Sequence, residues 1–366
     1  MANAALPTWL TAVVVPVVNV AVAFLAAGLV VALIGENPLT ALSGLMRGAF
    51  GSSYGIGYTL FYTTSFIFTG LAVAVAFHAG HFNIGGEGQA LMGGLGAALV
   101  ALGLPDLPAL LLVPLCVLGA AAGGAIWAFL PGWLQARRGS HIVITTIMFN
   151  FIASTLLVYL LVGPMKMAGS MAPETAQFPP AALLASAATI TGWFGWPMTR
   201  SPLNLSFALA LAAAFAVWLL IWRTRLGYAI RTVGANPEAA RYAGLSPARI
   251  TIVALVISGA LAGLMATNEI LGSQGRLIND FTAGAGFVGI AVALMGRGHP
   301  FGIVLAALLF GALTQGGAEL AFEMPAITRD MIVVIQGFVI LFAGALESLF
   351  ADRIAQIYRR VRPEAA

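Results

Sequence analysis

The chain has 366 residues, of which 60% are hydrophobic and only 8% are charged. A soluble domain carries about 25% charged residues, so this composition excludes a protein with an ordinary water-facing surface. The net charge of +4 does not indicate nucleic-acid binding, because the arginines are concentrated in a few loops. A single cysteine, Cys116, excludes an intrachain disulfide framework. We expect an all-α integral membrane protein.

The apolar stretches predict about ten transmembrane helices, because a helix needs about 20 mainly apolar residues to cross a bilayer. The predicted spans, in chain order, cover residues 10–34, 58–77, 84–103, 110–130, 142–162, 206–222, 250–271, 284–295, 301–321 and 331–350. The first stretch is too long for the apolar core of a signal peptide. The eighth is long enough only if it extends back through the glycine-rich residues 282–286.

Positively charged residues predict the orientation. With both termini inside, the inner segments hold Arg137, Arg138, Arg223, Arg225, Arg231, Arg241, Arg249, Arg297, Arg353, Arg359, Arg360 and Arg362. The outer segments hold Arg47, Lys166, Arg200, Arg276 and Arg329. Because cytoplasmic loops carry an excess of cations, both termini are predicted to be cytoplasmic.

Five predicted spans precede the long outer segment 163–204 and five follow it. An odd number of spans gives two halves of opposite orientation, here about 1–165 and 205–350. This predicts an inverted repeat within one transmembrane domain, 1–366, an arrangement in which transporters place the substrate site between the halves.

The outer segment contains Trp193, Trp196 and several prolines, which suit the membrane interface. It is either a surface where a receptor docks or a hydrophobic lid. A second polar stretch, from Asn268 to Asp280, is either an outer gate or an ordinary solvated loop.

Residues 223–249 form the longest polar and cationic interruption of the chain. Within it, Asn236 is a good N-cap, Pro237 suits the first helical position, and Gly244 can end a helix in a left-handed conformation. The predicted helix has about seven residues and is too short to be stable alone. We therefore expect it to lie against something, as a handle held by a cytoplasmic partner.

Two predicted spans meet at residues 77–89 with almost no loop. Among its glycines this junction holds Phe82, Asn83, Glu87 and Gln89. Polar side chains and broken backbone persist at membrane depth only where they are buried in protein or line a cavity. The junction is either part of a substrate pathway or a tight cytoplasmic turn. No metal site is predicted, because His78 and His81 lack a third ligand of suitable spacing.

Thr146 and Asn150 are four residues apart on one face of the predicted 142–162 span. Asn150 bonds either a polar ligand or a neighbouring helix. The chain has no catalytic grouping, because no histidine accompanies its serines in a recognisable motif. It also lacks a phosphate-binding loop, so no cofactor is expected and any ATP must be bound by another subunit.

The chain resembles the permease subunits of bacterial ATP-binding-cassette importers, in the nucleoside and simple-sugar branch related to ribose-type and branched-chain amino-acid permeases. Four segments carry the resemblance: Phe82-Asn-Ile-Gly-Gly-Glu-Gly-Gln89, Thr145-Thr-Ile-Met-Phe-Asn150, Gly234-Ala-Asn-Pro-Glu-Ala-Ala-Arg-Tyr-Ala-Gly244 and Gly286-Phe-Val-Gly-Ile-Ala-Val-Ala-Leu-Met-Gly296. The resemblance implies a location in the bacterial inner membrane and three kinds of partner protein. These are cytoplasmic ATP-binding subunits, a second permease that is identical or homologous, and an external substrate-binding protein.

In such permeases a short cytoplasmic helix inserts into a groove of the ATPase, and Glu238, Ala239, Ala240 and Gly244 fit that pattern. The predicted substrate-pathway residues are Phe82, Asn83, Glu87, Gln89, Thr146 and Asn150. Four positions depart from the nucleoside branch. His78 and His81 replace an arginine and a leucine, Ile142 replaces an acidic residue, and Phe151 replaces a tyrosine.

The first hypothesis is therefore a nucleoside permease, and the nearest alternative is a monosaccharide permease of the same class. An ion-coupled carrier working alone is a hypothesis of a different class. Glu87, Glu269 and Glu319 would carry its protons, but such a carrier has no need of the 223–249 loop.

Overall fold

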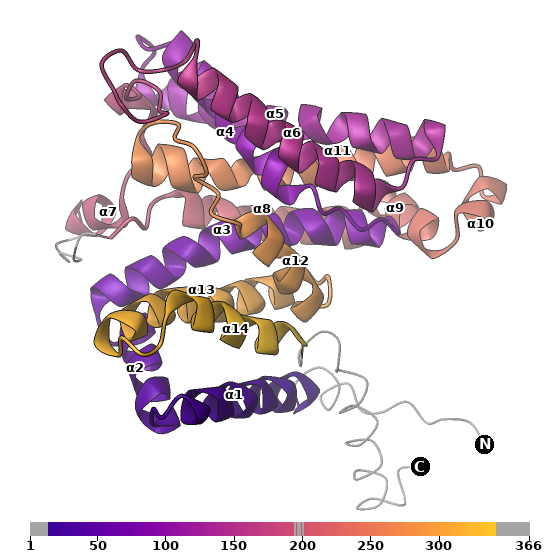
Figure 1. Cartoon of the computed structure of the whole chain (residues 1–366). Helices are drawn as coiled ribbons and strands as arrows, with labels where there is room; N and C mark the ends of the chain where they lie inside the picture. The colour runs from indigo at the N-terminus through magenta and orange to yellow at the C-terminus, as the bar shows by residue number, and fades with distance from the viewer. Residues whose placement is uncertain (1–13, 194, 196–198, 200, 342–366) are drawn as a thin grey trace, which may run out of the picture. The chain divides into compact units, whose positions relative to one another are not determined.

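The computed structural model describes residues 14–193, 195, 199 and 201–341. Within them the chain is built from helices and irregular segments, as the sequence predicts (Figure 1). Parts of several predictions lie outside the described residues. These parts are residues 10–13 of the first predicted span, residues 342–350 of the tenth, and Trp196, Arg200, Arg353, Arg359, Arg360 and Arg362.

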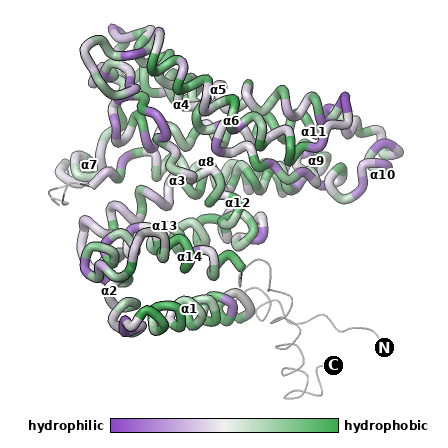
Figure 2. The backbone as a smooth tube through the Cα atoms, in the orientation of Figure 1, coloured by the Kyte–Doolittle hydropathy of each residue, from purple (hydrophilic) through white to green (hydrophobic). Residues whose placement is uncertain are grey.

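Each of the ten predicted spans overlaps a described helix. These helices are α1 (Val15–Leu33), α3 (Ser53–His78), α4 (Gly86–Gly103), α5 (Ala109–Arg138), α6 (Ile142–Val162), α8 (Ser206–Arg223), α11 (Pro247–Ala266), α12 (Ala285–Met295), α13 (Pro300–Glu323) and α14 (Arg329–Ile340). By length and composition alone, six of the described helices can cross a membrane. A bent pair near the N-terminus raises this to seven. The chain is thus a polytopic all-α membrane protein, and Figure 2 shows hydrophobic residues along most of its helices.

Apart from the short 3₁₀ helix η2 (Pro180–Ala182), four further helices of the described residues were not predicted as such. α2 (Pro38–Phe50) follows α1 at an angle of 118° after the Asn37 cap. α7 (Ala187–Trp193) lies in the outer segment, and α9 (Arg225–Ala235) lies in the cationic loop. η3 (Thr267–Gln274) continues α11 as a π-helix.

The short helix of the cationic loop is confirmed as α10 (Pro237–Tyr242). The Asn236 side chain accepts hydrogen bonds from the backbone N–H groups of Glu238 and Ala239, at 2.9 and 3.0 Å. Gly244 follows the helix with φ +78°, in the left-handed region that glycine adopts without a steric cost.

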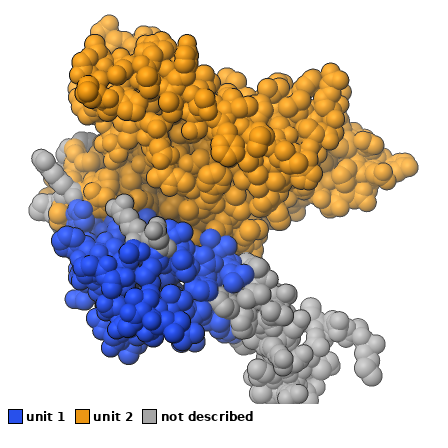
Figure 3. Space-filling view, in the orientation of Figure 1, with its two compact units in different colours: residues 1–55, 312–366 blue, residues 56–311 orange. Residues whose placement is uncertain are grey.

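Contacts divide the chain into two compact units, drawn in different colours in Figure 3. One consists of residues 1–55 and 312–366, and the other of residues 56–311. This division differs from the predicted halves, whose inverted symmetry stays a prediction.

In the 56–311 unit, α4 packs against α5, α6, α11 and α12. Glycines bring the backbones of these helices together. A Cβ atom on Gly96 would collide with the carbonyl group of Gly119 on α5, and one on Gly93 with the backbone of Gly263 on α11. Small residues at such positions let membrane helices approach closely. α4 is consequently buried along most of its length.

α12 is shorter than the prediction requires. The helix begins at Ala285, after Gly284 in a left-handed conformation, and therefore does not extend back through residues 282–284. Its 11 residues span about 16 Å at 1.5 Å per residue, roughly half of the hydrocarbon core. Residues 275–284, between η3 and α12, are irregular.

Candidate functional site

The break between α3 and α4 covers residues 79–85 and is the centre of the candidate site. α3 ends at His78, and Gly80 reverses the chain with φ +76°. The Asn83 Oδ1 atom then accepts a hydrogen bond from the Gly85 N–H at 2.8 Å, immediately before α4 starts. The break is thus an ordered turn.

Asn83 joins this turn to α4 and α11. Its Nδ2 group donates to Gln89 Oε1 at 3.0 Å and to Ser258 Oγ at 2.9 Å, while its Oδ1 atom also accepts from Gln89 Nε2. Ser258 in turn donates to the carbonyl oxygen of Ala72 on α3 at 2.6 Å. Asn83 and Gln89 are each 1% exposed, so their polar groups are bonded to protein in this conformation. Such bonding holds the broken backbone in place.

Glu87 connects the first turn of α4 to the start of α12. One carboxyl oxygen accepts hydrogen bonds from the Thr282 hydroxyl and from the Gly284 N–H at 3.0 Å. The other accepts from the Gly286 N–H at 2.8 Å. The free N–H groups and dipole of a helix N-terminus favour an anionic partner. Glu87 thereby fixes the two helix starts against each other.

α6 holds the same turn from another side. Asn150 Oδ1 accepts from the Gly88 N–H at 2.9 Å, and its Nδ2 group donates to the Ile84 carbonyl oxygen at 2.9 Å. Thr146 Oγ1 accepts from the Ile84 N–H at 3.3 Å. Of the two interpretations of Asn150, the structure shows bonding to a neighbouring segment.

The aromatic and histidine residues of the break have separate partners. Phe82 is partly exposed and packs edge-on against Phe77, with ring centroids 6.3 Å apart. His78 Nε2 lies 3.1 Å from the Gly298 carbonyl oxygen, and His81 Nε2 lies 2.8 Å from the Thr251 hydroxyl. Burial lowers the pKa of His81 below its usual value.

The cationic loop reaches the break through its Gly234. A Cβ atom there would collide with the His78 carbonyl oxygen and lie 2.9 Å from the Gly80 N. Gly234 stands two residues before Asn236, the residue that caps α10. All four segments that carry the sequence resemblance therefore meet at residues 78–89.

α10 itself presents an open surface. Pro237, Glu238, Ala239 and Tyr242 are exposed, Tyr242 to 95%, whereas Ala240 is fully buried against the chain. Hydrophilic residues gather around this helix in Figure 2. The small buried face and the open outer face agree with the predicted handle, although its partner stays a prediction.

For Asn268 and Glu269 the interpretation as a solvated loop is wrong, whereas Gln274, Asn279 and Asp280 are exposed. Asn268 is fully buried and Glu269 is partly buried, and both belong to the π-helix η3. Sequence analysis also missed Thr282 and Ser258. Thr282 lies in the glycine-rich stretch noted above, whereas no sequence signal distinguishes Ser258 from other serines in apolar spans.

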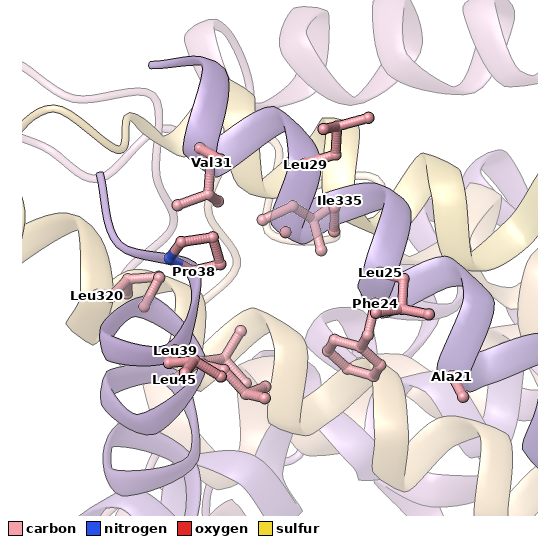
Figure 4. Close-up of a pocket in the computed structure, with 15 residues that line it drawn as sticks. Ala21, Phe24, Leu25, Leu29, Val31, Pro38, Leu39, Leu45, Leu320 and Ile335 are labelled. Carbon is pink, nitrogen blue, oxygen red and sulfur yellow. The ribbon is translucent and has the colours of Figure 1, made fainter. Parts of the chain in front are cut away.

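An apolar pocket in the described part of the chain does not belong to this site. It has a volume of about 660 Å³ and lies in the unit of residues 1–55 and 312–366. Figure 4 shows its apolar lining, which includes Phe24, Leu25, Leu45 and Leu320. A pocket without polar side chains offers little to orient a polar solute.

Comparison with known proteins agrees with these features. Residues 55–344 match the family described as the branched-chain amino acid transport system / permease component. The chain is 37% identical to the glucose ABC transporter permease protein TsgB13 of Haloferax volcanii, over 97% of this chain and 92% of that protein.

Two bacterial relatives are similarly close. The guanosine ABC transporter permease protein NupP of Bacillus subtilis is 35% identical, over 92% of this chain and 94% of the relative. The nucleoside ABC transporter permease protein NupB of Lactococcus lactis is 34% identical, over 90% of each chain. Matches of this extent cover the apolar helices, the α3–α4 break and the cationic loop together. The chain therefore belongs to the branched-chain amino acid transport system / permease component family, and it is a multi-pass permease subunit of an ATP-binding-cassette transporter.

Proposed function

We propose that this chain is the permease subunit of an importer that takes up nucleosides across the bacterial inner membrane. Separate cytoplasmic subunits bind and hydrolyse ATP, so the chain itself is no enzyme and holds no cofactor. A second permease, identical or homologous, completes the pathway, and an external substrate-binding protein delivers the solute. The guanosine and nucleoside permeases among the relatives support this substrate class.

The observation that carries the mechanism is the meeting of the four motif segments at residues 78–89. The pathway residues in this proposal are Phe82, Asn83, Glu87, Gln89, Thr146 and Asn150. In the described conformation most of their polar groups bond one another or nearby backbone. Opening the pathway therefore means exchanging some of these hydrogen bonds for bonds to the solute.

The coupling helix is α10 with its flanking turns, and its proposed residues are Gly234, Asn236, Pro237, Glu238, Ala239, Ala240 and Gly244. It fits a groove on the ATPase through its exposed face. Closure of the ATPase pair on ATP then moves α10, and contact between Gly234 and Gly80 passes that movement to the break. Rigid-body movement of packed helices is a common form of such switching.

The orientation has both termini in the cytoplasm. Arg137 and Arg138 end α5, and α9 and α10 carry Arg225, Arg231 and Arg241. This concentration of cations around the loops that follow α5 and α8 supports a cytoplasmic location for them.

A monosaccharide is the second candidate substrate, favoured by the 37% identity to a glucose permease. Uptake in cells lacking this chain tests both candidates. Cells with and without the chain are given radiolabelled guanosine, adenosine, ribose and glucose. Loss of guanosine or adenosine uptake alone supports the nucleoside proposal, and loss of ribose or glucose uptake alone supports the alternative. Unchanged uptake of every solute would contradict both.

A further inference from the structure

A second polar cluster lies apart from the α3–α4 break, between α3 and η3. It consists of Ser65, Asn204, Ser206, Asn268 and Glu269, and we call it the η3 cluster. Ser65 stands halfway along α3, and η3 continues α11 within one apolar stretch of 28 residues. The cluster therefore lies where the π-helical end of the α11 stretch and the start of α8 meet the middle of α3. π-helical turns inside longer helices occur frequently at functional sites.

Asn268 gives the cluster its framework. Its Nδ2 group donates to Ser65 Oγ at 2.8 Å and to the Phe61 carbonyl oxygen at 3.0 Å. Its Oδ1 atom accepts from Ser206 Oγ at 2.7 Å and from Asn204 Nδ2 at 3.1 Å. The fully buried Asn268 thus has its hydrogen-bonding capacity filled by protein and orders the groups around it.

Glu269 is bonded differently. One carboxyl oxygen accepts from Ser65 Oγ at 2.9 Å, and the side chain remains partly exposed. No ion pair in the described part of the chain includes Glu269. A carboxyl group at membrane depth is costly, and such groups usually face a bundle interior or a polar pathway. Glu269 therefore has hydrogen-bonding capacity that the fold does not use.

Two tyrosines stand on the same face of α3. Tyr58, Tyr62 and Ser65 are spaced i, i+4 and i+7, the spacing of residues one above another on a helix. Both tyrosines are partly exposed, and their ring centroids are 6.3 Å apart. This face of α3 therefore places two aromatic rings next to Ser65, the residue that bonds the Glu269 carboxyl group.

We propose that Glu269 accepts hydrogen bonds from neighbouring hydroxyl groups of the solute as it crosses, with Tyr58 and Tyr62 beside its ring. Carboxyl oxygens accept bonds from hydroxyl donors, and aromatic rings pack against flat apolar faces. Ribose and pyranose rings both carry such hydroxyl pairs. The inference rests on the proposed function in requiring a hydroxylated solute, but it applies equally to nucleosides and monosaccharides.

The test uses the assembled transporter in cells and two solutes that differ in one hydroxyl. Radiolabelled guanosine and 2′-deoxyguanosine are compared, or glucose and 2-deoxyglucose if the wild-type transporter takes up glucose. Glu269→Gln keeps one acceptor for Ser65 and changes the other oxygen into a donor. We expect uptake of the hydroxylated solute to fall about ten-fold, as for loss of a bond worth about 1.4 kcal/mol. Uptake of the deoxy solute should fall less than uptake of the hydroxylated solute, because its bond from the missing hydroxyl to Glu269 is already absent.

Controls separate this effect from a general defect. Glu323→Gln makes the same change on an exposed carboxyl group and should leave both rates unchanged. Ser65→Ala keeps the Glu269 carboxyl group but removes its hydrogen bond to Ser65, and it should reduce the preference for the hydroxylated solute. This variant tests the proposal even if Glu269→Gln fails to assemble. Equal loss for both solutes, or no loss for either, would overturn the proposal. The uptake rates of the wild-type transporter test the proposed function separately. If the wild-type transporter took up leucine but none of the hydroxylated solutes, both the proposed function and the role of Glu269 would be overturned.

Discussion

At the scale of single residues, Glu87 joins the starts of α4 and α12 through acceptors on both carboxyl oxygens. Glu87→Gln replaces one of these oxygens with an amide NH2 group, which donates and so faces other donors. We expect the change to destabilise the fold by roughly 2 kcal/mol, the usual worth of a hydrogen bond to a charged group. Thermal unfolding of the purified transporter measures this, with Glu323→Gln as the control. A midpoint equal to that of the wild type would contradict the assigned contact.

His81 makes the stability of the break depend on pH. Burial lowers the pKa of this histidine in the folded chain, so protonation favours the unfolded state. The contribution of neutral His81 is complete above the unfolded pKa, near 6.5, and is lost as the pH falls through the lowered folded pKa. We predict that His81→Gln, which can keep a hydrogen bond to Thr251, loses less stability than the wild type between pH 7 and pH 5. Melting curves at several pH values measure the difference, and parallel curves would refute it.

At the scale of elements, α10 depends on its turns. Proline at position 244 cannot adopt the observed φ of +78°, because its ring holds φ near −65°. Gly244→Pro should therefore abolish co-purification of the ATPase while the protein still inserts into the membrane. Glu238→Lys should weaken the same association by reversing a charge on the exposed face. Retention of the ATPase by both variants would count against α10 as the coupling helix.

The contact between the cationic loop and the break can be tested separately. Gly234→Ala adds a methyl group against the His78 carbonyl oxygen, and such overpacking costs about 1–3 kcal/mol. We expect the variant to bind the ATPase normally but to lose solute uptake, because the loop around Gly234 no longer packs against the break. Gly103→Ala is the matched control, since its added Cβ has no neighbour within 4 Å. Normal uptake by Gly234→Ala would remove this contact from the mechanism.

The sequence predicted elements that local chemistry specifies. α10 is determined by local capping and backbone conformation, at Asn236, Pro237 and Gly244. The predicted bounds of this helix therefore agree closely with the observed ones. η3 could not be found in this way, because Asn268 and Glu269 look like loop residues until α3 supplies their partners. The same limit applies to the break. Its polar residues were recognisable, but their partners on α6, α11 and α12 depend on tertiary packing.

At the scale of the whole molecule, the division of labour among subunits is testable. The chain belongs to a family of permease subunits, and the hypothesis of a carrier working alone requires protons to drive uptake through Glu87, Glu269 or Glu319. We expect the purified chain in vesicles to accumulate no guanosine or glucose under an imposed proton gradient. Adding its ATPase, second permease, binding protein and ATP should start accumulation. Accumulation by the chain alone would contradict the proposed function.

The glycine contacts among α4, α5 and α11 limit how the molecule can deform. Where backbones touch directly, few side chains remain that could change rotamer and let one helix slide past another. We therefore expect these three helices to move together as one rigid body throughout the transport cycle. Conformational changes during transport must then arise at the borders of these helices, where the irregular segment before α12 and the π-helix η3 after α11 provide places that can bend.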